Sequence, residues 1–571
     1  MEHAERMMRV EPGTPLVEAL RQTGMAIDQP CGGRGDCGKC RVRLFDIDFR
    51  TSVVEDVVAC RMRITKPIGV KIPFDKIVSN DRHRIVTEFT GDAVHHEHKD
   101  ISIHTKTHSE DDAAPVLVVD LGTTTLAATL VDPVTERSLA VASQLNPQTQ
   151  FGADVISRIE YVMRIPSGDA VLRGAVIGTI FGMAAIFREQ VKIPPQSIRK
   201  IIVAGNTTMQ NIAVGIDVRP LGEYPFTPVT FDSVKCRVSK LGAQHIRMPA
   251  KQSPFHRSAM LETLPVIGGF VGGDIVAGLL ATRFADAESP ALFLDIGTNG
   301  EIVLRHDDEW LATATAAGPA FEGARIRCGM RATTGAIHRC GIVDGMWQNE
   351  VIENSSAYKT TPSTAGTPIS GICGSALPDA IAALLDAGIV TPDGRILPPD
   401  RLPTELSNDL RRRVIPESTI NSAEDAAATR RMAFLLADTE QTYTGGPVYI
   451  AQRDIREVQL ASGAIRTGIE LLLHRAGVRA TKLKVVYLAG GFGNVLSIRS
   501  IQRIGMLPPE IEPDRIRTVG NSSLAGAVRY AISEESRKMA RSLARRTPSI
   551  DLSTDPAFQR TFAESMRFPT R

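Results

Sequence analysis

Four cysteines near the start of the chain are spaced so that their thiolates can hold an iron–sulfur cluster. Cys31, Cys37 and Cys40 lie on one glycine-rich loop and Cys60 follows downstream, which gives the pattern C-x5-C-x2-C…C. Four thiolates suffice for a [2Fe–2S] cluster, which three ligands on a tight loop would wrap while the fourth closes the other side. Glycines on the loop let backbone N–H groups approach the sulfur atoms and tune the potential.

A structural zinc site is the alternative use of these cysteines. Structural zinc usually takes its ligands from two paired knuckles, whereas here three cysteines cluster and one stands alone. The spacing therefore favours iron over zinc. The other cysteines lack ligand spacing, and we expect them to be small buried hydrophobic residues. They are Cys236, Cys328, Cys340 and Cys373.

Two similar turns further along the chain have the composition of a phosphate site. Asp120-Leu-Gly-Thr-Thr-Thr125 and Asp295-Ile-Gly-Thr-Asn-Gly300 each close an apolar strand that ends in the aspartate. Backbone N–H groups and hydroxyls of such turns can hold phosphate oxygens, and the aspartates can hold Mg²⁺ through water. Asp120 and Asp295 are therefore the predicted catalytic residues. The predicted phosphate contacts are Gly122, Thr123, Thr124, Gly297, Thr298 and Asn299.

A third glycine-rich turn follows a late strand, where small residues would let an adenosine lie against the backbone. It contributes Gly490, Gly491 and Phe492. Each turn alone could be a plain hairpin, and the prediction rests on all three in order at domain-scale spacing. Asn206 and Asp274 fit either this cleft or a turn-capping role. The roles of Phe321 and Glu322 are left open.

The elements that must position these residues divide the chain into three parts. Residues 1–78 contain a candidate helix from Pro15 to Thr23 and a short strand from Arg41 to Phe45. Residues 79–114 are a polar, histidine-rich linker that either binds metal or, as the lack of periodicity favours, is a solvated tether. From 115 to 571 apolar strands alternate with helical patterns, which predicts an α/β domain of two similar lobes facing one cleft.

Composition excludes several classes of protein. Lys+Arg 66 against Asp+Glu 64 leaves a net charge of +2, which argues against a nucleic-acid-coating protein. The N-terminus lacks the apolar core of a secretory signal. The longest apolar stretch, from Leu264 to Phe284, contains Asp274 and several glycines, so it predicts buried loop and helix rather than a membrane span. We expect a cytoplasmic protein that binds neither nucleic acid nor membrane.

These motifs resemble a known family. The loop PCGGRGDCGKCRV is similar to the cluster loop of [2Fe–2S] ferredoxins, which have a β-grasp fold, and the three turns resemble the ATPases of the acetate kinase/sugar kinase/Hsp70/actin superfamily. Segments such as VAGNTTM, GGFVGGDIVAG, LDIGTNGE, GICGSA and YLAGGFGN narrow the resemblance to reductive activators of corrinoid proteins. The match extends over nearly the whole chain, although the hairpin before Pro15 and the span between Cys40 and Cys60 are shortened.

The resemblance implies an activity, cofactors and partners. The chain would use ATP with Mg²⁺ to pass one electron from a [2Fe–2S] cluster to the Co(II) corrinoid of a methyl-transfer protein, regenerating Co(I). A reductase or ferredoxin would supply the electron, and a homodimer is compatible with the sequence. Three alternatives stay open at this point: an activator of another low-potential enzyme such as a radical dehydratase, a kinase-like ATPase with a structural zinc module, and a nucleotide-sensing electron carrier without turnover.

Overall fold

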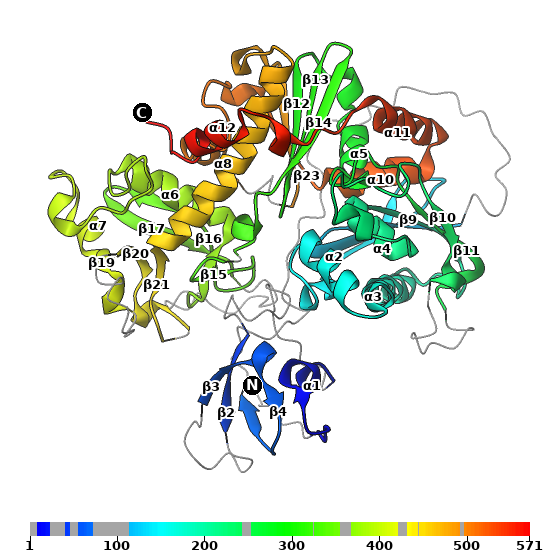
Figure 1. Cartoon of the computed structure of the whole chain (residues 1–571), viewed down its shortest axis with the longest axis horizontal. Helices are drawn as coiled ribbons and strands as arrows, with labels where there is room; N and C mark the ends of the chain where they lie inside the picture. The colour runs from blue at the N-terminus through cyan, green and yellow to red at the C-terminus, as the bar shows by residue number, and fades with distance from the viewer. Residues whose placement is uncertain are drawn as a thin grey trace.

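Two sheets that share the arrangement of five strands form the body of the molecule. In the computed structural model, each sheet starts as a three-stranded antiparallel meander, and two more strands join in parallel beside the first strand of the meander (Figure 1). The structure describes residues 8–22, 40–45, 55–71, 114–241, 253–323, 325–353, 367–420, 431–443, 445–491 and 496–570.

The first lobe is built on a six-stranded sheet of order β10-β11-β9-β6-β7-β8. One of its faces packs on three helices and forms a core of aliphatic and phenylalanine side chains. The strands are β6 (Val116–Leu121), β7 (Thr125–Val131), β8 (Ser138–Leu145), β9 (Ile198–Gly205), β10 (Lys235–Arg237) and β11 (Phe255–Thr263). The helices are α2 (Val155–Arg164), α3 (Gly168–Val191) and α4 (Thr207–Val214).

The second lobe is built on a five-stranded sheet of order β14-β13-β12-β22-β23, and the long helix α8 packs on one of its faces. Its elements are β12 (Ala291–Ile296), β13 (Gly300–His306), β14 (Glu309–Thr315), α8 (Gln452–Arg475), β22 (Val485–Ala489) and β23 (Ile516–Gly520). The two meanders confirm the internal repeat, because Asp120 and Asp295 each occupy the fifth position of the first strand.

A segment between β14 and α8 enlarges the second lobe with two smaller sheets, of order β15-β18-β16-β17 and β19-β20-β21 (Figure 1, left). The strands are β15 (Gly329–Met330), β16 (Ala336–Val343), β17 (Met346–Val351), β18 (Gly371–Cys373), β19 (Val414–Pro416), β20 (Met432–Ala437) and β21 (Val448–Ala451). The helices here are α6 (Leu377–Asp386) and α7 (Asn408–Arg412), and α9 (Ile498–Arg503) packs on α6.

Two helices lie between the large sheets and join the lobes. They are α5 (Gly273–Ala281) and α10 (Ser522–Ile532), and α11 (Glu534–Arg546) packs beside them. One hydrophobic core contains Val118 of the first sheet, Phe293 of the second, and residues of both helices. Gly526 makes the close approach possible, because a Cβ there would lie 1.8 Å from the carbonyl oxygen of Ala277.

The small N-terminal unit lies below the two lobes in the view of Figure 1. Its helix α1 (Leu16–Gln22) packs near a three-stranded sheet of order β3-β2-β5, and a two-stranded ladder joins β1 to β4. The strands are β1 (Thr14–Pro15), β2 (Arg41–Phe45), β3 (Glu55–Val58), β4 (Arg63–Ile64) and β5 (Gly69–Lys71). The predicted strand at Arg41 to Phe45 is confirmed, and the predicted helix begins one residue later than expected.

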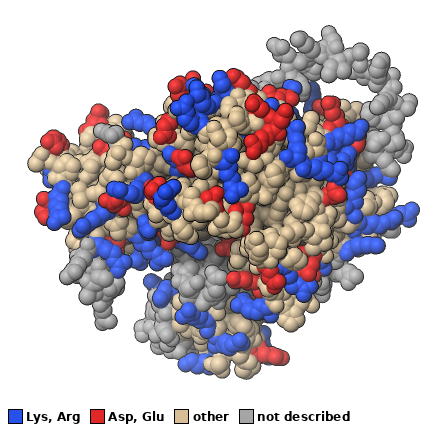
Figure 2. Space-filling view, turned by 45° about the horizontal axis from the view of Figure 1, so that its top comes forward, with Lys and Arg blue, Asp and Glu red and all other residues tan. Residues whose placement is uncertain are grey.

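Helix α3 is long and apolar enough to cross a membrane by length and composition, and this stretch was not singled out from the sequence. In the structure its apolar residues, including Leu172, Ile180 and Phe187, belong to the core of the first lobe. The Leu264–Phe284 stretch forms loop and helix α5, as predicted. The C-terminal helix α12 (Phe558–Ser565) packs on α8. On the molecular surface, basic and acidic side chains are interspersed over the face shown in Figure 2.

Replacing Gly526 by alanine should lower the thermal midpoint by several degrees, because overpacking costs about 1–3 kcal/mol and each kcal/mol shifts a large domain by about 2–4 °C. The matched control is Gly182→Ala on α3, where no atom lies within 4 Å of the added Cβ. Alanine there should hold or raise the midpoint, since glycine destabilises a helix interior by about 0.5–1 kcal/mol. Equal shifts in the two variants would contradict the close packing of α5 and α10.

Candidate functional site

The two Asp-Gly-Thr turns occupy equivalent hairpins of the two sheets. Asp120 stands opposite Ala127 in the β6–β7 ladder, and Asp295 stands opposite Glu301 in the β12–β13 ladder. The first turn is tight at its glycine, since a Cβ on Gly122 would lie 2.7 Å from the carbonyl oxygen of Thr125. Glycine is therefore required there by the close approach of the backbone.

Asp120 is held from the opposite lobe. The amide of Asn521 donates to its Oδ2 at 2.9 Å, and the hydroxyl of Ser523 donates to its Oδ1 at 2.7 Å. Both donors come from the start of helix α10, where the Asn521 side chain also caps the helix through Leu524 N. Burial nevertheless raises the pKa of Asp120, and the two hydrogen bonds only partly oppose this effect. These donors belong to the segment VGNSSLAGA, but the sequence did not assign them to Asp120.

Three further carboxylates gather near Asp120. Burial and repulsion by Asp295 and Asp120 raise the pKa of Asp274, in the first turn of α5, to about 8. Burial, and to a smaller extent repulsion by Asp120, raises the pKa of Asp295 to about 7. The pKa of Glu301 is raised well above its usual range by burial and by Asp274 and Asp295. Carboxylate oxygens are ligands that Mg²⁺ takes in proteins, and mutual repulsion favours the uptake of a cation. Among the described residues, however, no three of these side chains are placed as a ready-made set of metal ligands.

A glutamate connects the two turns directly. Glu322 ends the short 3₁₀ helix η11 (Pro319–Glu322), and its Oε2 accepts a hydrogen bond from Thr124 Oγ1 at 2.6 Å. Its Oε1 accepts a hydrogen bond from Thr298 Oγ1. One carboxylate thus bridges the hydroxyls of both lobes, where phosphate oxygens would be acceptors of the same groups. The sequence left Glu322 open, and Phe321 beside it is a buried core residue.

A fully buried arginine lies behind the first turn. Arg158 of α2 donates to the carbonyl oxygens of Gly152, at 2.9 Å, and of Thr123. Burial lowers its pKa to about 9, while the charges of Asp154 and Glu322 act in the opposite direction. Sequence reasoning missed this residue. The available signal was its position on the apolar face of the amphipathic helix, among Val155 and Ile159.

Other predicted residues are also brought to the two turns. Asn206 combines both of its candidate roles, because its Oδ1 caps α4 through Met209 N and its Nδ2 donates to Thr123 Oγ1 at 3.0 Å. Gly490 has a φ of 100°, and a Cβ there would lie 2.7 Å from Asp295 Oδ1. Asn299 hydrogen-bonds the side chain of Glu301. Gly491 follows Gly490, whereas Phe492 lies outside the described residues.

Two of the four predicted cluster ligands are described, and they lie at one end of the β2–β3 ladder. Cys40 is fully buried, Cys60 is half-buried, and Ala59 N donates to the Cys40 carbonyl oxygen at 2.9 Å. This brings the loop cysteine and the distant cysteine together, which is what a shared cluster needs. Cys31 and Cys37 lie outside the described residues. Residues 79–113 of the predicted linker also lie outside them.

The remaining cysteines differ in their burial. Cys373 is buried and lies 2.8 Å from Ser375 Oγ, whereas Cys236, Cys328 and Cys340 are half-buried. Burial raises the pKa of the Cys236 thiol to about 11, so at neutral pH it is a protonated thiol. Within the parts of the chain that the structure describes, there is no group of three or more His, Cys, Asp and Glu side chains placed as metal ligands.

Comparison with known protein families gives three matches that together cover most of the chain. Residues 2–65 match the model of the 2Fe-2S iron-sulfur cluster binding domain, residues 116–287 match the RACo middle region, and residues 289–571 match the C-terminal, ASKHA domain of RACo. The expected α/β class, with a ferredoxin-like unit followed by an actin/Hsp70-like ATPase unit, is confirmed by these matches.

Individual relatives agree with the family models. The corrinoid activation enzyme RamQ of Eubacterium limosum is 30% identical over 452 residues, which are 79% of this chain and 70% of the relative. A [Co(II) methylated amine-specific corrinoid protein] reductase of Methanosarcina barkeri is 23% identical over 444 residues, 74% of this chain and 70% of the relative. The solved structure of a reductive activator for corrinoid, iron-sulfur protein superposes with a TM-score of 0.65 at 27% identity, covering 98% of this chain and 96% of that one.

The acidic group predicts an unusual dependence of stability on pH. Because the native pKa values of Asp274 and Asp295 are raised above those of the unfolded chain, the native state binds extra protons between about pH 4 and 8. The free energy of unfolding of the protein without nucleotide or metal should therefore fall as the pH rises through this window. Asp274→Asn should raise the thermal midpoint at pH 8 by about 2–4 °C and change it little at pH 5.

Thermal melts of the wild type and of Asp274→Asn at pH 5 and at pH 8 check this expectation. The control is Asp308→Asn, which removes an exposed carboxylate from the loop between β13 and β14. A uniform shift of Asp274→Asn at both pH values would contradict the predicted ionisation.

Proposed function

This chain belongs to the family of reductive activators of corrinoid proteins, and we propose that it regenerates the Co(I) state of a corrinoid-bearing methyl-transfer protein with ATP as the energy source. The observation that carries the proposal is Glu322, which joins two phosphate-type turns from opposite lobes in a chain that also has a ferredoxin unit. An electron carrier and a two-lobed ATPase in one polypeptide fit an electron transfer that needs an energy source.

The energetic problem explains the need for ATP. Plant-type [2Fe–2S] centres lie near −400 mV, and the Co(II)/Co(I) couple lies lower still. Each 100 mV uphill costs one electron about 2.3 kcal/mol. A nucleotide can help only by binding two conformations of the protein with different affinity. Glu322 can provide such a difference in affinity, because its carboxylate and the phosphates of ATP would compete for the hydroxyls of Thr124 and Thr298.

The cluster would be held by Cys31, Cys37, Cys40 and Cys60, and when bound it supplies one-electron chemistry. Two described ligands support this assignment. Cys40 precedes β2 and Cys60 lies in η1 (Ala59–Arg61), and the hydrogen bond from Ala59 N to the Cys40 carbonyl oxygen brings these two segments together. An external reductase or ferredoxin would be the electron source. We assign the ferredoxin unit to residues 1–78, the tether to 79–114 and the ATPase to 115–571, in the cytoplasm.

In the proposed nucleotide site each turn has its own task. The N–H groups and hydroxyls of the two Asp-Gly-Thr turns would bind the phosphates, and Asp120 and Asp295 would hold Mg²⁺ through water. Buried Arg158 adds positive charge behind the first turn. The phosphate-binding residues are Gly122, Thr123, Thr124, Gly297, Thr298 and Asn299, and the adenosine would lie against Gly490, Gly491 and Phe492.

Glu322 has two successive tasks in this scheme. Without nucleotide its carboxylate accepts the hydroxyls of Thr124 and Thr298 and holds the turns together. The γ-phosphate of ATP replaces it as the acceptor, so the carboxylate is released beside the phosphate. There it can accept the proton of the attacking water as a general base, a role that typically contributes 10²–10⁴-fold to a rate.

Cysteine and aspartate variants should separate the two halves of the function. Cys60→Ser should abolish the [2Fe–2S] visible spectrum and the EPR signal of the dithionite-reduced protein purified without oxygen, while ATP binding persists. Asp295→Asn should abolish ATP binding but leave the visible spectrum and the EPR signal of the cluster unchanged. Cys236→Ser, a half-buried cysteine of the ATPase unit, is the control and should retain both properties. Colourless wild-type protein carrying one zinc would refute the redox assignment.

Glu322→Gln should separate ATP binding from ATP hydrolysis. We expect kcat to fall by about 100-fold, because glutamine cannot accept the proton of water. The affinity for ATP should be unchanged or higher, because the competing negative charge is gone. Steady-state kinetics and nucleotide titration measure the two effects. A weaker affinity with unchanged kcat would show that Glu322 serves only to bind nucleotide.

A further inference from the structure

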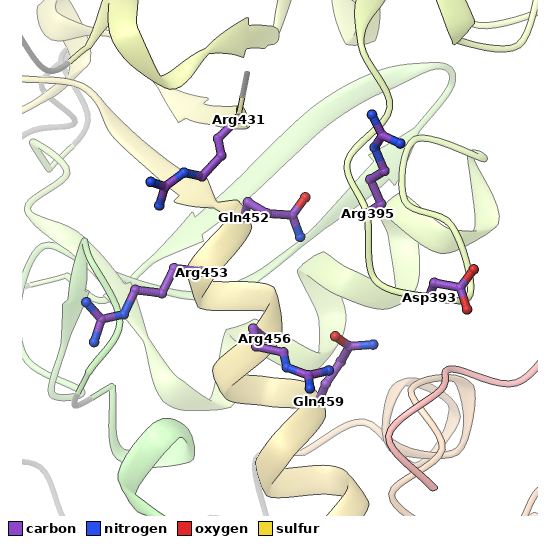
Figure 3. A pocket seen from close by; sticks show the side chains of 7 residues that line it. All are labelled: Asp393, Arg395, Arg431, Gln452, Arg453, Arg456 and Gln459. Carbon is purple, nitrogen blue, oxygen red and sulfur yellow. The ribbon is translucent and has the colours of Figure 1, made fainter. Parts of the chain in front are cut away.

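Four arginines surround the first turn of helix α8. We refer to Arg395, Arg431, Arg453 and Arg456 as the arginine face. They border a shallow pocket of about 330 Å³, and Figure 3 shows their side chains. The other lining residues are Asp393, Gln452 and Gln459.

Positive charge predominates on this face. Among the described residues that line the pocket there is one carboxylate, Asp393, and it pairs with Arg567 at 3.0 Å. The glutamines are held by the fold, since Gln452 Nε2 donates to the Gly394 carbonyl oxygen at 2.6 Å and Gln459 Nε2 donates to that of Met566 at 2.9 Å. Arg453 also lies 3.9 Å from the carboxylate of Glu457 on its own helix, but an ion pair of so exposed an arginine contributes little, so its guanidinium can still bind an external carboxylate.

The directions of the side chains distinguish between small and large anions. In Figure 3 the side chains of Arg431 and Arg453 extend to one side of the helix, Arg395 points away on the other side, and Arg456 lies beside Gln459. Arg395, Arg453 and Arg456 are exposed at the surface. Guanidinium groups that spread in this way do not converge on one oxyanion. They suit several carboxylates of a broad surface, each of which can bind a guanidinium in a bidentate manner.

The first turn of α8 is fastened to the segment that carries Glu322. The buried Asp454 accepts hydrogen bonds from Ala451 N at 2.9 Å and from Arg327 N at 2.8 Å, and Arg327 follows η11 in the chain. Helix α8 also packs on η11, and Phe321 lies in the same core as Ile455 of α8. Hydrogen bonds and packing thus connect the first turn of α8 to the segment that carries the carboxylate of Glu322.

We propose that the arginine face is a docking surface for an acidic face of a protein partner, and that docking is coupled to the nucleotide site through Asp454 and η11. The identity of the partner rests on the proposed function, under which it is the corrinoid-bearing protein. Arginine is enriched at protein interfaces, and the charge of this surface selects an acidic complement. By reciprocity, a partner that changes the affinity for ATP is itself bound with an affinity that ATP changes.

A fluorescent octaglutamate peptide tests the surface directly on the full-length protein by anisotropy. Arg453→Gln/Arg456→Gln should weaken its binding at least about fivefold, the sum expected of two exposed ion pairs. The matched control is Arg479→Gln/Lys482→Gln, which removes two exposed cations of the same spacing from the second lobe and should change binding less than about twofold. Arg395→Gln, on a separate loop, serves as the second variant should the double variant misfold. No binding to wild type, or equal loss in both double variants, would overturn the proposal.

Two further arms complete the test. Inorganic phosphate at matched ionic strength should not displace the peptide, and specific displacement would reassign the face to a small anion and refute the partner. Saturating peptide should shift the affinity of the wild type for ATP by about threefold but leave that of the Arg453→Gln/Arg456→Gln variant unchanged. No shift in the wild type would refute the coupling. These readouts use neither cluster nor corrinoid, so their failure is distinguishable from failure of the proposed function.

Discussion

Negative charge enclosed where the two lobes meet is the constraint on which the rest of this structure depends. Asp120 comes from the first sheet, Asp295 and Glu301 from the second, and Asp274 from a helix between them. Their mutual repulsion opposes closure of the lobes unless protons or a cation offset it. A cation bound among these carboxylates would therefore favour closure of the lobes.

Opposing this repulsion are hydrogen bonds that cross between the lobes. Asn521 and Ser523 hold Asp120 from the start of α10, and Glu322 connects Thr124 with Thr298. Such bonds to charged acceptors are stronger than neutral ones, and inside a protein they are lost together when the lobes separate. The cleft is thus a balance of two large electrostatic effects, which is the condition for a small ligand to shift it.

The packing determines where such a shift can go. Helices α5 and α10 approach each other so closely at Gly526 and Ala277 that no side chain fits between them at this point. Helix α8 packs against the other face of the second sheet and against η11, so it follows the Glu322 segment rather than the first lobe. Close-packed cores transmit displacement in this way because they have few voids to absorb it. The ferredoxin unit has its own small core and is built independently of this machinery.

Local sequence patterns were enough to predict the internal repeat, the two phosphate-type turns and the cysteine ligand set. The apolar strands ending in Asp120 and Asp295, the glycines of the turns and the cysteine spacing are local patterns, and each follows from what backbone and side chain can do over a few residues. Glu322, Arg158, Asn521 and Ser523 escaped prediction because their roles depend on partners far away in the chain. Asn206 shows the division within one residue: its cap on α4 is local, while its bond to Thr123 exists only after β6 and β9 pair. Which buried carboxylates lie near one another became visible in the tertiary structure alone. The energy of a buried charge depends on neighbours that are distant in the chain, and no local pattern specifies them.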